Sequence, residues 1–260
     1  MNGTENKPKR LLKEGKRVSA AWLQSGNPIM AEIVARCGFD VVMIDMEHGP
    51  GDILTLISQV QACQCSASVP FARAPWNDLV AIKRILDAGV YGLLVPYVNS
   101  AEEARAAVAA AKYPPLGVRG IAGSPRAAGF GYNQGAYFKA ANDEIFVMTA
   151  VETLEAASNL DAILSVEGLD GIFIGPMDLA TSMGYLGDPS AAPVKAAIEE
   201  IERKVFASGK ILATVGGSWA DAKSKYEKGY RLIVSMSDTV TLAQAARERA
   251  DAFRKDFPER

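Results

Sequence analysis

The chain has 260 residues, close to the roughly 250 of a single (β/α)8 barrel, although two small domains would also fit this length. Its 49% hydrophobic and 22% charged residues are typical of a soluble globular protein. A net charge of −2 without a basic stripe argues against a nucleic-acid partner. No apolar run could cross a bilayer, and residues 1–17 lack the apolar centre of a signal peptide. We therefore expect a cytoplasmic protein with no membrane partner.

Short apolar runs alternate with longer helical stretches along the whole chain. The apolar runs are nearly continuous, as in parallel strands buried on both faces, and predict strands over residues 18–22, 41–45, 69–72, 92–96, 145–151, 171–174, 211–215 and 232–235. Helical segments are expected over residues 28–37, 53–64, 79–88, 101–112, 153–162, 193–207, 219–228 and 239–253. Ser100 is a candidate helix N-cap. The glycines expected to close helices are Gly38, Gly89, Gly209 and Gly229.

Eight strands alternating with eight helices favour an α/β fold in which a (β/α)8 TIM barrel forms one domain over residues 1–260. Residues 1–15 are expected to be a flexible or surface extension. An open doubly wound sheet is the alternative that periodicity does not exclude. The long segment 113–142, which carries Arg119 and Arg126, is either a functional loop or a surface excursion that covers the barrel or contacts a neighbouring subunit.

The cysteines do not indicate a disulfide framework. Cys37, Cys63 and Cys65 are odd in number, and two of them are separated by one residue. They also lack the spacing and the additional ligands of a zinc site. We expect reduced thiols.

Polar residues follow several predicted strands, at the end where (β/α)8 barrels carry their active sites. Glu152 follows the fifth strand and Asp178 follows the sixth. Two neighbouring carboxylates repel unless a cation lies between them or one is protonated, and Mg²⁺ or Mn²⁺ uses few protein carboxylates. The pair therefore indicates a metal site. The alternative is that one or both merely cap the following helices.

His48 is the only histidine, and it follows the second strand by three residues. A lone histidine is often structural or exposed, but Asp45 and Glu47 lie close to it in sequence, and a neighbouring carboxylate supports an imidazole as general base. Arg73 follows the third strand, where it would hold a substrate oxo group or carboxylate, or else pair with a carboxylate of the site.

Lysine is missing from the predicted strand ends. Lys210 precedes the seventh strand and so belongs to the opposite end of the barrel. Schiff-base chemistry needs a lysine in the site, so metal activation is favoured over an imine. The segments GVRGIAG and GFGYNQG lack dinucleotide-binding spacing, and no P-loop is present, so no nucleotide cofactor is expected.

Several motifs together resemble the HpcH/HpaI family of class II pyruvate aldolases. The order of EHGP, VET and IGPMDL is the most specific feature, and the resemblance extends from about Trp22 to Ala246. Further matching segments are AEIVARCGFDVVMID, RAPWND, IKRILDAGVYGLLVPYVNSAEEARAAV and YPPLGVRG. The resemblance implies a (β/α)8 barrel, usually a homo-hexamer built as a trimer of dimers, with a C-terminal helix exchanged between subunits.

The resemblance also implies a role for individual residues. It makes Glu152 and Asp178 the ligands of a divalent Mg²⁺, Mn²⁺ or Co²⁺ ion. The implied catalytic residues are His48 as base, Asp45 as its partner, Arg73 at the substrate oxo group, and Asp87, an acid presented across a subunit interface. The implied pyruvate carboxylate pocket is formed by Gly175, Pro176, Met177 and Asp178. Trp22 and Val215, at the ends of the first and seventh strands, are added as candidate substrate contacts.

The expected reaction is reversible cleavage of a 4-hydroxy-2-oxo acid to pyruvate and an aldehyde through a metal-stabilised enolate. Ala150 stands where some family members have glutamine, and the seventh strand ends in Val215-Gly216-Gly217-Ser218, so the natural substrate is left open. The rival enzymatic activities are cleavage of an acyl-CoA ester such as malyl-CoA and decarboxylation of oxaloacetate. A non-catalytic barrel that senses an oxo acid is the rival of another class.

Overall fold

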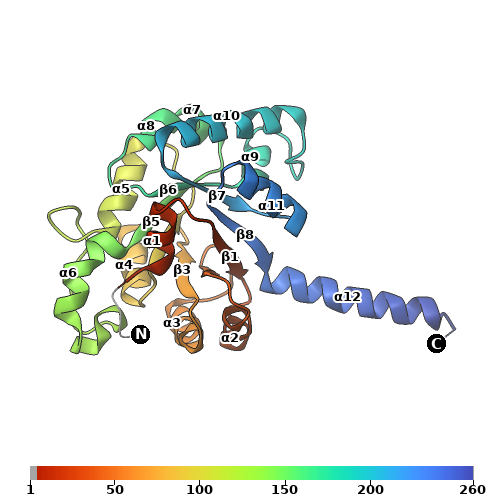
Figure 1. Ribbon diagram of the computed structural model, residues 1–260, viewed down its shortest axis with the longest axis horizontal. Coiled ribbons are helices and arrows are strands. Elements are labelled where there is room, and N and C mark those ends of the chain that lie inside the picture. The colour runs from red at the N-terminus through yellow and green to blue at the C-terminus, as the bar shows by residue number, and fades with distance from the viewer. Residues whose placement is uncertain (1–4, 260) are drawn as a thin grey trace.

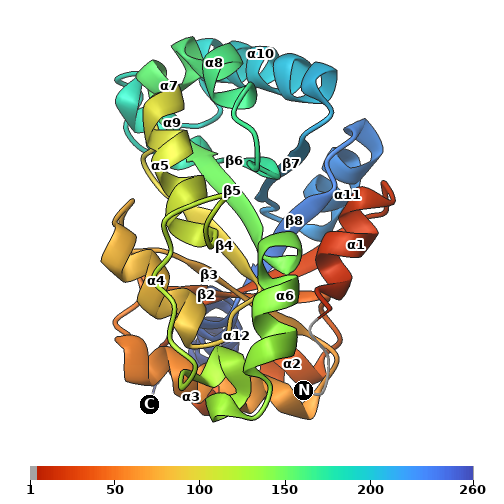
Figure 2. The same cartoon turned by 90° about the vertical axis from the view of Figure 1, so that its left-hand side faces the viewer.

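Eight parallel strands close into a barrel with helices around it in a computed structural model that describes residues 5–259 (Figures 1 and 2). The strands pair in chain order, and β8 pairs with β1, so the predicted closed barrel is confirmed and the open doubly wound sheet is excluded. The strands are β1 (Val18–Leu23), β2 (Val41–Asp45), β3 (Val69–Arg73), β4 (Gly92–Val95), β5 (Phe146–Val151), β6 (Gly171–Ile174), β7 (Ile211–Val215) and β8 (Leu232–Ser237).

The expected helices are present, with one broken in two. They are α2 (Pro28–Arg36), α3 (Ile53–Ala62), α4 (Leu79–Asp87), α5 (Ala101–Ala111), α7 (Leu154–Ser158), α8 (Leu160–Leu164), α10 (Ala192–Ser208), α11 (Trp219–Lys228) and α12 (Asp238–Asp256). The single helix expected over residues 153–162 is wrong, because Asn159 leaves helical geometry between α7 and α8 and donates its side-chain amide to the carbonyl of Asn99. Ser100 caps α5 as predicted, and the four predicted helix-closing glycines all have positive φ.

Side chains alternate between the barrel interior and the helical layer, as period-2 strands in a barrel require. In β1, Ala20 and Trp22 belong to the interior cluster, while Ala21 and Leu23 belong to the cluster beneath the helices. Phe71 stacks on Phe146 inside the barrel, with ring centroids 5.7 Å apart. A Cβ at Gly92 would lie 2.2 Å from the Phe71 ring, so a glycine is needed there for this filling of the interior.

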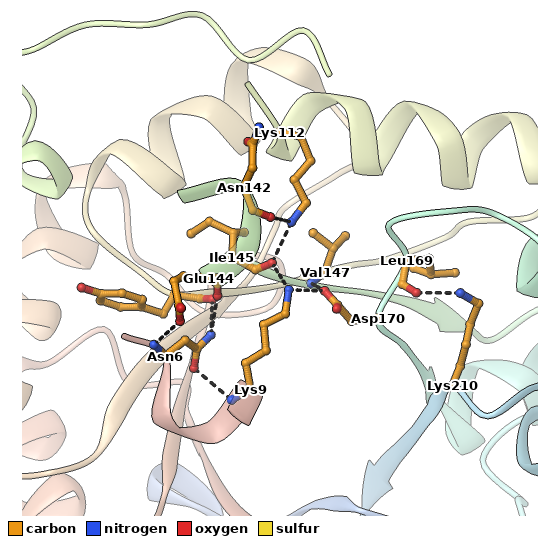
Figure 3. A network of polar contacts seen from close by, with 11 residues as sticks. Asn6, Lys9, Lys112, Asn142, Glu144, Ile145, Val147, Leu169, Asp170 and Lys210 are labelled. Carbon is orange, nitrogen blue, oxygen red and sulfur yellow. Dashed lines mark hydrogen bonds and ion pairs between the residues drawn. The ribbon is translucent and has the colours of Figure 1, made fainter. Parts of the chain in front are cut away.

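Residues near the N-terminus close the barrel at the N-terminal ends of the strands (Figure 3). Helix α1 (Lys7–Lys13) buries Leu12 in the interior cluster. The Lys9 ammonium donates to the Ile145 carbonyl at 2.8 Å and to Asp170 at 3.0 Å. Lys112 also donates to the Ile145 carbonyl, at 2.9 Å. Residues 6–12 are thus part of the packed barrel and not the expected surface extension, of which residues 1–4 lie outside the described residues.

The segment 113–142 is an ordered excursion near the same end of the barrel. It contains the 3-10 helix η2 (Arg126–Gly131) and leads into α6 (Gln134–Glu144). Arg119 is buried and donates to Asp87 at 2.7 Å, and Arg126 donates to the carbonyl of Ala88 at 3.1 Å. Both arginines therefore bind the C-terminal end of α4, which leads into the start of β4.

The C-terminal helix stands apart from the other helices. Helix α12 projects away from the barrel, and most of its residues are exposed (Figure 1). None of the described helices combines the length and the apolar character that a bilayer crossing requires.

Candidate active site at the C-terminal end of the barrel

Strand register explains how the first pair of site residues meets. Asp45, the last residue of β2, lies directly opposite Arg73, the last residue of β3. The Arg73 guanidinium donates from Nε to Oδ1 of Asp45 at 2.9 Å and from Nη2 to Oδ2 at 2.6 Å, which is the bidentate geometry that arginine favours. The guanidinium also lies over the Trp22 ring, 4.6 Å from its centroid. Arg73 is therefore held from below by an indole and from the side by a carboxylate.

Asp45 is a fully engaged acceptor. In addition to Arg73 it accepts the side-chain amide of Gln24 at 3.0 Å and the backbone N–H groups of Glu47 and His48 at 3.1 and 3.2 Å. Burial would raise the pKa of Asp45, but the hydrogen bonds and charge of Arg73, aided by Gln24, outweigh burial and hold this pKa below its usual value. Asp45 thus shapes the turn after β2 and stays ionised as the partner of Arg73.

The imidazole of His48 lies near a different carboxylate from the one expected. Its Nε2 is 3.8 Å from Glu47, and its side chain is 61% exposed at the mouth of the barrel. The two carboxylate oxygens of Asp45 accept hydrogen bonds from the backbone N–H groups of His48 and Glu47 and from the side chains of Gln24 and Arg73. In this chain the expected Asp45–His48 side-chain dyad is replaced by Asp45–Arg73, because the register sets the two strand ends opposite each other.

Glu47 lies between the Arg73 guanidinium and the His48 imidazole, and it was not among the expected site residues. Its carboxylate lies 3.1 Å from Nη1 of Arg73 as well as near His48. Burial raises the pKa of Glu47 above its usual value, with Asp45 and Asp178 adding to the rise and Arg73 opposing it. The sequence signal was available, since Glu47 immediately precedes the only histidine.

Glu152 lies one residue beyond β5 and is 4% exposed. Its Oε1 accepts the backbone N–H of Tyr97 at 2.7 Å. Thr153, and not Glu152, caps α7, so the capping alternative does not hold for this carboxylate. Burial raises the pKa of Glu152 to about 7; the Tyr97 N–H opposes this rise, as does Arg73, while the charges of Glu47 and Asp178 add to it.

Gly175 makes room for the Glu152 carboxylate on its other side. β5 pairs with β6 so that Val151 lies opposite Ile174, which brings Glu152 beside Gly175. A Cβ at Gly175 would lie 2.8 Å from Oε2 of Glu152. Asp178 follows in the first turn of the short helix α9 (Pro176–Ser182), and Met177 beside it is half exposed.

Of the remaining expected residues, two lie at the C-terminal end of the barrel and one lies at the opposite end. Trp22 is at the site beneath Arg73, and Val215 ends β7 against the interior cluster. Asp87 ends α4, which runs antiparallel to the strands, so it lies at the other end of the barrel and is paired with Arg119. In a single chain Asp87 and His48 are therefore not brought together.

Gln24 and Tyr97 also belong to the site although they were not expected there. Gln24 follows β1, and Tyr97 lies two residues beyond β4. The first and fourth strand ends could have been inspected in the same way as the others. Their side chains, however, carry no charge that would indicate chemistry.

The carboxylates at this end of the barrel suit a cation. Glu47, Glu152 and Asp178 interact electrostatically, and the nearby Arg73 is already paired with Asp45. Hard carboxylate oxygens are the ligand type that Mg²⁺ and Mn²⁺ prefer. Within residues 5–259 no group of three or more metal-ligating side chains is gathered closely enough to hold an ion, so the candidate is a site of few protein ligands with open positions.

Comparisons with known proteins identify the family and the class of enzyme. Residues 19–245 match the family HpcH/HpaI aldolase/citrate lyase. The 5-keto-4-deoxy-D-glucarate aldolases of several Escherichia coli strains are 41% identical over 234 residues, covering 90% of this chain and 91% of the relative. The chain therefore belongs to the HpcH/HpaI family and is a carbon–carbon lyase of the aldolase type.

Solved structures agree with this assignment. A crystal structure of a family member from Burkholderia cenocepacia J2315 is 33% identical, with a TM-score of 0.91 and coverage of 96% of this chain and 99% of that one. An HpcH/HpaI aldolase from Desulfitobacterium hafniense DCB-2 is 29% identical, with a TM-score of 0.87 and coverage of 95% and 96%. Membership of the family implies dependence on a divalent metal ion and a small-molecule substrate.

Proposed function

We propose that the protein cleaves a 4-hydroxy-2-oxo acid to pyruvate and an aldehyde and catalyses the reverse aldol addition. The observation that carries the proposal is the group of carboxylates around Glu152 beside an arginine already fixed by Asp45, at the end of the barrel where such enzymes act. The Escherichia coli relatives are named for 5-keto-4-deoxy-D-glucarate, which makes that sugar-derived acid the first substrate to test.

Glu152 and Asp178 would hold the divalent ion. Glu152 fits this role because its carboxylate is buried, oriented by the Tyr97 N–H, and given space by Gly175. When bound, Mg²⁺, Mn²⁺ or Co²⁺ supplies Lewis acidity that stabilises negative charge on the 2-oxo group. Neither a nucleotide nor a Schiff-base lysine has a part in the proposed reaction.

His48 would act as the base. In the cleavage direction the imidazole removes the proton of the 4-hydroxyl group. The C3–C4 bond then breaks, the electron pair of that bond forms the enolate of pyruvate, and the aldehyde leaves. Protonation of C3 then gives the methyl group of pyruvate. The exposed imidazole at the mouth can reach a substrate that enters from solvent, and the Glu47 carboxylate lies 3.8 Å from its Nε2.

Arg73 would hold the oxo oxygen as negative charge develops on it. Its guanidinium is fixed in advance by Asp45 and by the Trp22 ring, so little reorganisation is needed during the reaction. We assign Asp45 to the positioning of Arg73.

The pyruvate carboxylate would bind at the start of α9. The first-turn N–H groups of a helix have no intrahelical acceptors and favour an anion, and Met177 and Asp178 lie in that turn. The aldehyde would extend towards Val215 at the end of β7 and over Trp22, the two other candidate substrate contacts.

The assembly is also part of the proposal. Helix α12 leaves the barrel with Leu242 and Phe253 60% and 51% exposed, a surface suited to packing against a second copy. Exchange of α12 between subunits of a homo-hexamer, a trimer of dimers, would cover it. Only a neighbouring subunit could bring Asp87 to His48, because the two lie at opposite ends of one barrel. The cytoplasm remains the expected location.

Release of pyruvate from a panel of 4-hydroxy-2-oxo acids, with and without a chelator, tests the proposal. We expect chelator-sensitive pyruvate release that added Mn²⁺ or Mg²⁺ restores. Full activity in excess chelator would contradict the metal site. Cleavage of malyl-CoA or oxaloacetate alone would favour the related lyase or decarboxylase, and oxo-acid binding without turnover would favour a sensor.

A further inference from the structure

Tyr97 has an unusual backbone conformation. Among the described residues other than glycine, only Tyr97 and Phe130 have positive φ, and the value at Tyr97 is 53°. A bulky side chain in this region costs free energy and persists only where its surroundings hold it. Such outliers gather at functional sites, and Tyr97 lies two residues beyond β4, at the catalytic end of the barrel.

The amide of this strained residue meets the candidate metal ligand. The N–H of Tyr97 donates to Oε1 of Glu152 at 2.7 Å, a charge-assisted hydrogen bond when the carboxylate is ionised. On the other side, Oε2 lies so close to Gly175 that a Cβ there would be 2.8 Å away. The carboxylate is therefore oriented through Oε1 by the Tyr97 N–H and packs closely against Gly175, and Oε2 is the oxygen that does not accept from Tyr97.

The chain on the far side of Tyr97 is firmly anchored. Val98 is fully buried, so the chain must turn into the core immediately after Tyr97. Asn99 donates to the Tyr97 carbonyl at 3.4 Å and accepts a short hydrogen bond from the hydroxyl of Thr153, the residue after Glu152. Because φ sets the angle between the amide and the chain that follows, the positive value lets the amide face Glu152 while Val98 enters the core.

The Tyr97 ring is held as well. It stacks on Trp76 with ring centroids 5.6 Å apart and an interplanar angle of 29°. Both residues are exposed, at 42% for Tyr97 and 55% for Trp76, so burial in the core does not explain the pair. The stack adds a further restraint on the same strained residue.

We propose that Tyr97 is a positioning residue for metal binding. Its left-handed backbone, held by Val98, Asn99 and the Trp76 ring, aims the amide at Oε1 of Glu152 and leaves Oε2 for the cation. This inference rests on the proposed function, since it assigns a role towards the metal ligand Glu152. It concerns the backbone of Tyr97, and the hydroxyl group has no part in it.

Mn²⁺ titration calorimetry of the full-length protein tests the inference by substitutions with opposite backbone preferences. Tyr97→Val introduces a β-branched residue that resists positive φ, and we expect the Mn²⁺ Kd to rise roughly 10–100-fold, the usual effect of losing an outer-shell partner. Tyr97→Gly accepts positive φ freely but loses the stack on Trp76, so its rise in Kd should be clearly smaller than that of Tyr97→Val. Tyr97→Phe, the matched control that keeps the ring, should stay within about threefold of the wild type.

Each result decides the question. Wild-type affinity in Tyr97→Val, or equal losses in the Val and Gly variants, would overturn the role of the backbone. Glu152→Gln distinguishes failure of the proposed function: if it leaves the Mn²⁺ Kd unchanged, the metal site itself is wrong, whatever Tyr97 does. If it abolishes binding while Tyr97→Val binds normally, the inference about Tyr97 alone is wrong.

Hydrogen exchange of the Tyr97 amide gives a second measurement without any change at residue 97. In the metal-free protein this N–H should be protected, and Glu152→Ala should accelerate its exchange about tenfold or more by removing the acceptor. The matched control is Glu200→Ala, an exposed surface change that should leave exchange at Tyr97 unaltered. Equal exchange in the wild type and Glu152→Ala would overturn the inference.

Discussion

The two ends of the barrel bury charges of opposite sign and satisfy them differently. At the N-terminal end, Lys9 and Lys112 share the carbonyl of Ile145, and Lys9 also pairs with Asp170 (Figure 3). At the C-terminal end, Glu47 and Glu152 lie beside an arginine already paired with Asp45. In the first network the lysine ammonium groups donate to acceptors within the protein, the Ile145 carbonyl and Asp170. In the second network carboxylate charge remains that suits an added cation.

This difference separates a network that serves stability from one that serves chemistry. The Ile145 carbonyl, just before β5, accepts a hydrogen bond from Lys9 and so helps to attach α1 to the barrel. The raised pKa of Glu152, about 7, shows that its ionised form is poorly compensated by the surrounding chain. Removing a charge should therefore have opposite consequences at the two ends.

The largest effect is expected from loss of the metal ligand. Glu152→Gln should lower kcat/KM for pyruvate release roughly 10⁴-fold, because the Lewis acid supplies several kcal/mol of transition-state stabilisation. The thermal midpoint of the metal-free protein should not fall, because glutamine keeps an acceptor for the Tyr97 N–H and removes a buried charge. Glu200→Gln, an exposed change of the same type, is the control. Normal turnover in Glu152→Gln would place the metal elsewhere.

Loss of the base should rank next. His48→Ala should lower kcat roughly 10²–10⁴-fold, the usual contribution of a general base, with little effect on stability because the side chain is 61% exposed. Steady-state kinetics together with a urea unfolding curve would separate the two effects. A loss of activity below about threefold would remove His48 from that role.

A change at the opposite end should affect stability and spare the chemistry. Lys9→Met removes the partner of Asp170 and a donor to Ile145, and should lower the free energy of unfolding by about 2–4 kcal/mol. Lys13→Met lies in the same helix on an exposed residue and is the matched control. The folded Lys9→Met enzyme should keep its kcat. Equal stability of the two variants would show that the network in Figure 3 contributes little.

The smallest expected effect is a pH dependence at the N-terminal end. Burial, with the charge of Lys9 added, lowers the pKa of Lys112 to about 8, below its value in the unfolded chain. Between these two values the unfolded state binds more protons, so the contribution of Lys112 to stability should rise as the pH increases from 8 to 10. We expect the wild type to gain about 1–2 kcal/mol relative to Lys112→Met over this interval. Parallel pH profiles from urea unfolding would contradict a lowered pKa.

Most of the barrel could be predicted because its strands are buried on both faces. Each predicted strand ends within two residues of the observed end, and glycines mark the ends of four helices as expected. Helix α1 was missed because the residues that anchor it, Asn6 and Lys9, are polar, and their burial depends on carbonyls of distant strands. The break between α7 and α8 was missed because Asn159 binds Asn99, 60 residues away.

The positions of the candidate site residues at the strand ends were predicted better than the contacts between them. Arg73, Glu152 and Asp178 lie where strand-end reasoning put them. The partner of Asp45 was expected to be His48 and is Arg73, because sequence proximity favoured one and strand register the other. Glu47 lies between the Arg73 guanidinium and the His48 imidazole, and Tyr97 meets Glu152 through its backbone N–H, so both contacts depend on tertiary placement.

The sequence by itself determined the barrel, its family and the residues at each strand end, because hydrophobic period, helix-closing glycines and motif order are properties of the chain read in one direction. Only the tertiary structure decided which charges meet. It paired Asp45 with Arg73, aimed the Tyr97 amide at Glu152, and set Asp87 at the opposite end from His48. The physical reason is that electrostatic interactions depend on distance and burial, and both are fixed by register and packing between segments far apart in the chain.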